Sequence, residues 1–122
     1  MAINGNARLH LRTDGDVILD QLYNLPENPA SPGMVETVSL DAGVPNNIPV
    51  PSIPGYSVKS VLIKPLQSNL LPYTLAMNGG MSNLWLHATS PSFIALDAVP
   101  FGSNLVVQFL GTVKQTYTFV WI

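Results

Sequence analysis

The sequence predicts an all-β fold, a two-sheet antiparallel sandwich that is jelly-roll-like and carries a proline-rich extended arm. Three observations lead there. Runs of Val, Ile, Thr, Tyr, Phe and Trp alternate with clusters of Gly, Pro, Asn and Ser, apolar residues never recur at helical spacing, and prolines concentrate in one segment. The 122 residues form one domain, since this length leaves no room for a second core.

Nine short runs, spaced at about ten residues, are typical of a sandwich, and the jelly roll is the architecture with about eight strands. The predicted strands cover residues 7–13, 16–23, 35–40, 56–64, 71–77, 82–88, 93–98, 104–110 and 115–122. Within the domain we expect an amino-terminal hairpin over 1–23, a proline-rich arm over 24–55 and the main sandwich over 56–122.

The first and last strands show the clearest alternation. In the first, Leu9 and Leu11 alternate with charged residues and histidine, as in a strand with one buried face. In the last, Tyr117, Phe119 and Trp121 point one way, and we expect both faces of this strand to be covered because it lies centrally. The Asp14-Gly15 and Asn78-Gly79 pairs predict tight hairpin turns.

Seven of the eleven prolines lie between residues 24 and 55, interrupted only by the predicted strand at 35–40. Proline fixes φ and lacks a backbone donor, so residues 48–55 should run extended without joining the interior of a sheet. Two interpretations stay open: an arm docked on a neighbouring subunit, or a rigid loop folded over the edge of its own sandwich.

Charged residues are unusually scarce, at 10% of the chain against about a quarter in ordinary soluble domains. Eight of the twelve lie in residues 1–41, which leaves Lys59, Lys64, Asp97 and Lys114 for the other 81 residues. Such a surface favours a permanent oligomer over a monomer. Five scattered basic residues argue against a nucleic-acid partner, and the short apolar runs against a membrane span. Residues 1–6 lack a basic segment followed by an apolar stretch, so we expect no secretory signal.

Chemistry-bearing residues form no specific motif, so we expect no catalytic residue, no cofactor and no metal site. The chain has no cysteine, and neither His10 nor His87 lies in a ligand cluster. A hydrolase triad could be assembled only from common residues: Ser90 or Ser92, His87 and Asp97. Neither serine lies in a Gly-x-Ser-x-Gly nucleophile elbow. We therefore predict that the protein is not an enzyme.

Aromatic residues allow a second class of function, a carbohydrate-binding sandwich with exposed stacking rings. Trp85 points opposite to Leu84 and Leu86, which makes it the best candidate for an exposed ring. A core or subunit-interface position for Trp85 is the favoured interpretation.

Most of residues 35–122 resembles the small β-sandwich accessory proteins of tailed bacteriophage virions. The segments that carry the resemblance are 38–51 (VSLDAGVPNNIPVP), 61–65 (VLIKP), 73–75 (YTL), 84–87 (LWLH) and 119–122 (FVWI). The resemblance implies a non-enzymatic capsid decoration or cement protein, often trimeric, located in virions assembled in the host cytoplasm. Its partners would be copies of itself and the major capsid protein or another virion protein. The alternatives are a carbohydrate- or receptor-binding module, or a tail or baseplate subunit, of the same kind of particle.

We expect the subunit contacts to involve the proline-rich segment, the apolar edge near Trp85 and the charged amino-terminal segment. The predicted interface residues are Ile48, Pro49, Val50, Pro51, Ile53, Pro54 and Trp85.

Overall fold

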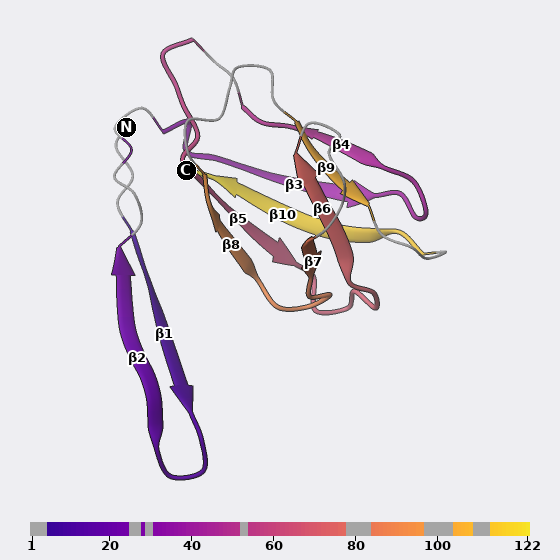
Figure 1. Ribbon diagram of the computed structural model, residues 1–122. Helices are drawn as coiled ribbons and strands as arrows, with labels where there is room; N and C mark the ends of the chain where they lie inside the picture. Colours follow the sequence, from indigo (N-terminus) through magenta and orange to yellow (C-terminus); the bar gives the residue numbers. More distant parts are fainter. Residues whose placement is uncertain are drawn as a thin grey trace.

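A computed structural model describes residues 5–24, 28, 31–51, 54–77, 84–96, 104–108 and 113–122. Within these residues the chain is all-β, with ten strands, and every strand pair is antiparallel (Figure 1). The strands are β1 (Asn6–Arg12), β2 (Val17–Asn24), β3 (Met34–Leu40), β4 (Asn46–Pro49), β5 (Ser60–Pro65), β6 (Tyr73–Met77), β7 (Leu84–Leu86), β8 (Ser92–Ala95), β9 (Asn104–Gln108) and β10 (Gln115–Trp121).

Eight of these strands form two four-stranded sheets. One has the order β3-β10-β5-β8 and the other β4-β9-β6-β7. Four pairs are nested along the chain, because β3 pairs with β10, β4 with β9, β5 with β8 and β6 with β7. The eight strands therefore behave as one long antiparallel double strand that is wound into two layers, and the predicted two-sheet sandwich is confirmed.

The core lies between the two sheets and is centred on β10. Tyr117, Phe119 and Trp121 are completely buried, as their shared direction along the strand predicts. The Phe119 and Trp121 rings stack with centroids 5.8 Å apart, and the Trp121 indole Nε1 donates a hydrogen bond to Glu36 on β3 at 3.2 Å. Burying side chains of this size stabilises the fold by about 1.5–3 kcal/mol each.

The outward face of β10 differs from the prediction. β10 is a central strand, between β3 and β5, but Thr116, Thr118 and Val120 are only partly buried. The outer face of β10 is therefore less completely covered than predicted, while its inner face is fully buried.

β4 is the strand that the sequence analysis missed. It lies at the edge of its sheet. Pro49 has no backbone N–H to donate, and an edge strand tolerates this because one of its sides has no neighbouring strand. The Asn46 side chain secures the turn before it by accepting a hydrogen bond from the Asp41 N–H at 2.8 Å and donating to the Asp41 carbonyl at 3.0 Å. Ile48 and Val50 are 3% exposed and belong to the core. The sandwich thus begins at β3, before the boundary predicted at residue 56.

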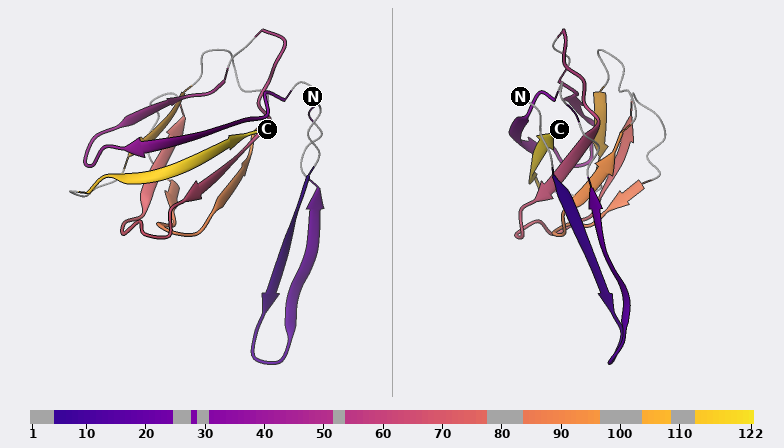
Figure 2. Two further views of the ribbon diagram at one scale, coloured as in Figure 1. Left: turned by 180° about the vertical axis from the view of Figure 1, so that it is seen from behind. Right: turned by 90° about the vertical axis from the view of Figure 1, so that its left-hand side faces the viewer.

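The two remaining strands, β1 and β2, form a separate two-stranded ribbon in the predicted amino-terminal hairpin. From here on we call this ribbon, residues 6–24, the arm; it is not the proline-rich segment 24–55. Figures 1 and 2 show that the arm projects away from the sandwich. Its turn contains Gly15, whose φ of 95° is the left-handed conformation that glycine adopts without strain. Between arm and sandwich, the buried Asn28 donates a hydrogen bond through Nδ2 to the Ser57 carbonyl at 2.8 Å, which ties the connection to the sandwich. The Asn78-Gly79 turn lies outside the described residues.

Two buried tyrosines give a test of the core. The rings of Tyr73 and Tyr117 lie 4.2 Å apart, but only Tyr117 has a hydrogen-bond partner for its hydroxyl, the Gln115 Nε2 at 2.9 Å. The Tyr73 hydroxyl has none among the described residues. We expect Tyr73→Phe to raise the free energy of unfolding by about 1 kcal/mol and Tyr117→Phe to lower it by about as much. Urea unfolding at neutral pH measures both.

The same pair sets the alkaline limit of stability. Burial raises the pKa of Tyr117 to about 12 and that of Tyr73 further, while unfolded tyrosines titrate near 10. Above pH 10 the unfolded chain releases protons that the folded chain keeps, so the free energy of unfolding should fall between pH 10 and 12. Tyr73→Phe should make this decline shallower, and an unchanged slope would contradict burial of that hydroxyl.

Candidate assembly surfaces

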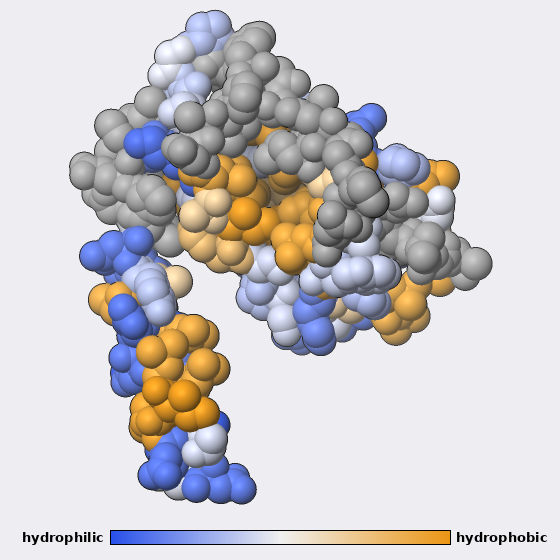
Figure 3. Space-filling view, viewed as in Figure 1, coloured by the Kyte–Doolittle hydropathy of each residue, from blue (hydrophilic) through white to orange (hydrophobic). Residues whose placement is uncertain are grey.

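The two faces of the arm differ in composition. Alternation and pairing place Ala7, Leu9, Leu11, Leu19 and Tyr23 on one side, with Gln21 as the single polar residue among them. We call this side the apolar face of the arm. Figure 3 shows apolar side chains gathered along the arm on the side turned to the viewer.

The opposite face, which we call the polar face, carries the ion pair of the arm, although register also places Leu22 and Val17 there, 56% and 53% exposed. The Arg8 guanidinium donates to both oxygens of Asp20 at 2.9 and 2.8 Å, and His10 Nδ1 lies 3.5 Å from the same carboxylate. The hydrogen bond from Arg8 holds the pKa of Asp20 below its usual range, and the pKa of Arg8 is raised in return. Because this ion pair is solvent-exposed, it fixes the register of the two strands more than it stabilises the fold.

The apolar face is uncovered. Leu9 is 43% and Leu11 44% exposed, so the expectation that one face of this strand is buried is wrong for the isolated chain. A two-stranded ribbon is at best marginally stable in water without a surface to pack on. This face is therefore a candidate interaction surface.

An apolar cleft separates the arm from the sandwich. Ala7, Leu9 and Tyr23 lie on its arm side, and Phe93 and Ala95 of β8 on its sandwich side. The cleft also touches Arg8 and Asn24, and its volume is about 600 Å³. The base of the apolar face and the outer surface of β8 therefore border one shared space without filling it.

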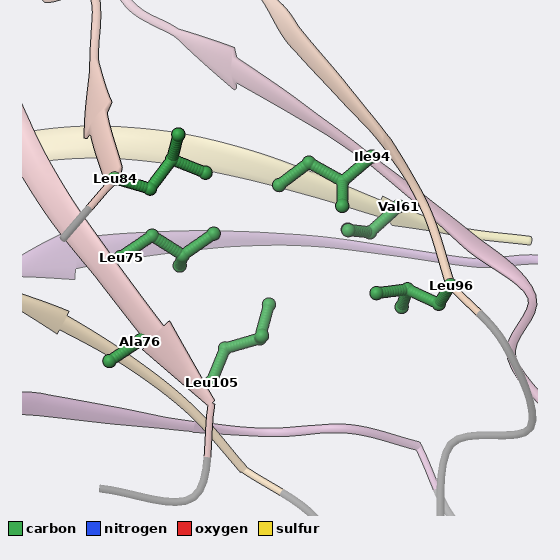
Figure 4. A pocket seen from close by; sticks show the side chains of 7 residues that line it. All are labelled: Val61, Leu75, Ala76, Leu84, Ile94, Leu96 and Leu105. Atoms are coloured by element: carbon green, nitrogen blue, oxygen red, sulfur yellow. The ribbon is translucent and has the colours of Figure 1, made fainter. Parts of the chain in front are cut away.

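A second apolar cavity, of about 220 Å³, lies between the two sheets on the side of β7 and β8. Figure 4 shows its aliphatic side chains, which come from both layers; those of Leu84, Ile94 and Leu105 point toward one another. They belong to Val61, Leu75, Ala76, Leu84, Ile94, Leu96 and Leu105. This end of the core is packed less completely than the end around β10, and its lining offers no polar side chain for chemistry.

The predicted interface residues fall into three groups. Ile48 and Val50 are buried in the chain's own core, which removes them from any docking surface. Pro49 and Pro54 are exposed and Pro51 is partly buried, so these remain predicted contacts, while Ile53 lies outside the described residues.

Trp85 stands out among the predicted contacts. It is 62% exposed on β7, an edge strand of its sheet. Its ring points away from the core, as the opposite direction of Leu84 and Leu86 predicts, and Leu86 is buried.

The residues considered for catalysis are not assembled into a site among the described residues. His87 Nδ1 accepts hydrogen bonds from the backbone N–H groups of Thr89 and Ser90, at 3.2 and 3.0 Å, so this nitrogen closes a turn. Asp97 lies outside the described residues. No group of three or more histidine, aspartate or glutamate side chains that could hold a metal ion occurs in the ranges described above.

Comparison with known proteins adds no relative, because no family model, no curated protein and no solved structure matches this chain. In the part of the chain that the structure covers, no helix has the length and hydropathy required to cross a bilayer.

The ion pair on the arm gives a direct test of its register. We expect the carboxyl carbon of Asp20, followed by NMR, to titrate below the ordinary aspartate pKa, and Arg8→Gln to move that pKa upward. The stabilising contribution is present above the ordinary pKa and is lost as pH falls through the lowered one. Arg12→Gln is the control. A pKa of Asp20 that does not respond to Arg8→Gln would contradict the pairing.

Proposed function

We propose that this chain is a non-enzymatic structural protein of a virus particle, a capsid decoration or cement protein that oligomerises and stabilises the shell. The observation that carries the proposal is the uncovered apolar face of the arm. Covering this apolar face with another surface removes it from water, which stabilises the arm. Binding to an assembled shell, and not to its separate parts, stabilises that shell by the binding free energy.

We infer further that the sandwich is a jelly roll. Support comes from the nested pairing of eight strands into two sheets of four. Capsid proteins and lectins both use this architecture, so the fold alone does not choose between a structural and a sugar-binding role. The scarcity of charge and the apolar arm favour the structural role.

The expected partners are copies of the same chain, with a trimer favoured, and the major capsid protein; the expected location is the virion. An arm that leaves one subunit and contacts the next is a head-to-tail contact, which closes into a ring when the rotation between subunits permits. A trimer is one such ring. A tail or baseplate subunit of the same particle would use the same surfaces.

Substitutions on the arm test self-association. Light scattering of the native protein should give a multiple of 13.1 kDa, and Leu9→Ser combined with Leu11→Ser should shift it toward the monomer. Each leucine contributes about 1.5–3 kcal/mol when fully covered, which is roughly tenfold or more in Kd. Thermal unfolding of the sandwich should not change, since the arm lies outside the core.

The matched control is Leu22→Ser, because Leu22 is 56% exposed on the opposite face of the arm and should leave the mass unchanged. A native protein that is a monomer at micromolar concentration would overturn self-association. Shells assembled from the coat protein of the same virus should bind the native protein in co-sedimentation. Failure to bind, despite an intact oligomer, would overturn the decoration role alone.

A carbohydrate-binding module is the second candidate, favoured by the exposed Trp85. If this role holds, a glycan array should show specific binding that Trp85→Ala abolishes, because stacking on the ring would be lost. Leu70→Ala is the control, since Leu70 is 74% exposed and has no ring. Absence of specific binding on the array would leave Trp85 as a contact for protein.

A further inference from the structure

We propose that His87 is a pH-sensitive switch, which holds the chain between β7 and β8 in place while its ring is neutral and releases it in weak acid. Residues 87–91, which we call the crossing turn, join an edge strand of one sheet to an edge strand of the other. This inference goes beyond the proposed function, because it concerns the sandwich itself and not the partner that the protein binds.

One nitrogen of the His87 ring organises the crossing turn. Nδ1 accepts hydrogen bonds from the backbone N–H groups of Thr89 at 3.2 Å and of Ser90 at 3.0 Å. The Thr89 hydroxyl oxygen lies 3.3 Å from the same nitrogen. Two backbone donors and one hydroxyl therefore converge on a single ring atom.

This arrangement fixes the protonation state of the ring. A backbone N–H can only donate, so Nδ1 of His87 must offer a lone pair and the ring proton must lie on Nε2. A protonated imidazole carries hydrogen on both nitrogens and cannot accept from either N–H group. The closed turn therefore requires a neutral ring, and proton uptake removes both hydrogen bonds at once.

The direction of the pH effect follows from the same contacts. Histidine ordinarily gains a proton as the pH falls from about 8 to about 5. Because the open turn can bind a proton that the closed turn excludes, acid shifts the equilibrium toward the open turn. The hydrogen bonds to His87 thus stabilise the crossing turn in neutral and alkaline solution and are lost as the pH falls.

The charged and titratable groups beside the crossing turn do not respond in this range. β5, β6, β7 and β8 carry no carboxylate side chain. Tyr73 of β6 lies opposite Leu86, and burial raises its pKa far above neutrality. Lys64 of β5 follows the residue that pairs with Ser92, and lysine as a residue type keeps its charge in weak acid. Among these groups, His87 is the one that weak acid changes.

His10 offers an internal comparison. Its Nδ1 lies 3.5 Å from a carboxylate oxygen of Asp20, whose pKa is lowered by the hydrogen bond from Arg8. A carboxylate only accepts, so a proton on His10 adds a favourable charge at this contact. Acid therefore acts in opposite directions on the two histidines: it strengthens a contact on the arm and removes contacts in the crossing turn.

The switch acts on the strand that presents Trp85. β7 has three residues and pairs on one side only, with β6. The crossing turn begins directly after β7, two residues beyond the exposed Trp85 ring. A short edge strand has few hydrogen bonds of its own, so opening of the turn should loosen it as well. Weak acid should thus release the ring that both candidate functions place at a contact.

NMR of the isotope-labelled native protein tests the switch directly. At about pH 8 the His87 ring should carry its proton on Nε2, and a scalar coupling across the hydrogen bond should link Nδ1 with the Ser90 amide nitrogen. At about pH 5 that coupling should be absent. Protection of the Thr89 and Ser90 amides against exchange, corrected for the intrinsic effect of pH, should fall roughly three- to tenfold, as expected for one hydrogen bond. The amides that join β7 to β6 should follow, and those of β10 should not.

His87→Asn is the rescue variant. An asparagine side-chain oxygen accepts from N–H groups two and three residues further on and gains no proton in weak acid, so this turn should stay closed at both pH values. His87→Phe, which cannot accept, should leave both amides unprotected throughout. His10→Asn is the matched control and should keep the native response.

A His87 ring with its proton on Nδ1 at about pH 8, or amide protection that acid leaves unchanged, would overturn the switch. An acid response that persists in His87→Asn would do the same, because another group would then cause it. Loss of protection confined to the crossing turn, with β7 unaffected, would overturn the release of Trp85. These outcomes are independent of self-association, which light scattering tests separately.

Discussion

The apolar face of the arm is the constraint on which the behaviour of this protein depends. Eight strands pair in a nested order and complete a core of their own, so the sandwich has no interior position left for β1 and β2. A ribbon of two strands has too few neighbours to bury its own leucines. The chain therefore folds into one part with a complete core and one part whose apolar side chains stay exposed, and the proposed assembly would cover the latter.

Stability and association are consequently separate properties. The core depends on Tyr117, Phe119 and Trp121 and on buried polar groups that are satisfied within the sandwich, such as Gln115, whose Oε1 accepts the N–H groups of Leu70 and Leu71 at 2.7 and 2.8 Å. None of these contacts involves the arm. Asn28 ties the connection to the sandwich, which lowers the entropy that a partner must overcome when it orders the arm.

Local sequence patterns predicted where the strands lie better than they predicted what packs against those strands. Alternation in the first and last strands located β1 and β10, because side-chain period is a local property. The same alternation could not show that Leu9 is exposed, since a pattern identifies an apolar face and not what covers it. β4 was missed because Pro49 argues against a strand, and only the pairing with β9 shows that it lies at an edge. Ile48 and Val50, predicted at an interface, are core residues for the same reason.

The scarcity of charge follows from this division. Arg8 and Asp20 pair with each other on the polar face of the arm, and Lys114 pairs with Asp41 at 3.2 Å, so several of the few ions are already satisfied at the surface. An interface formed by uncharged surfaces avoids the cost of burying an unpaired ion. The scarcity of charge that first sets this sequence apart is therefore compatible with the proposed assembly.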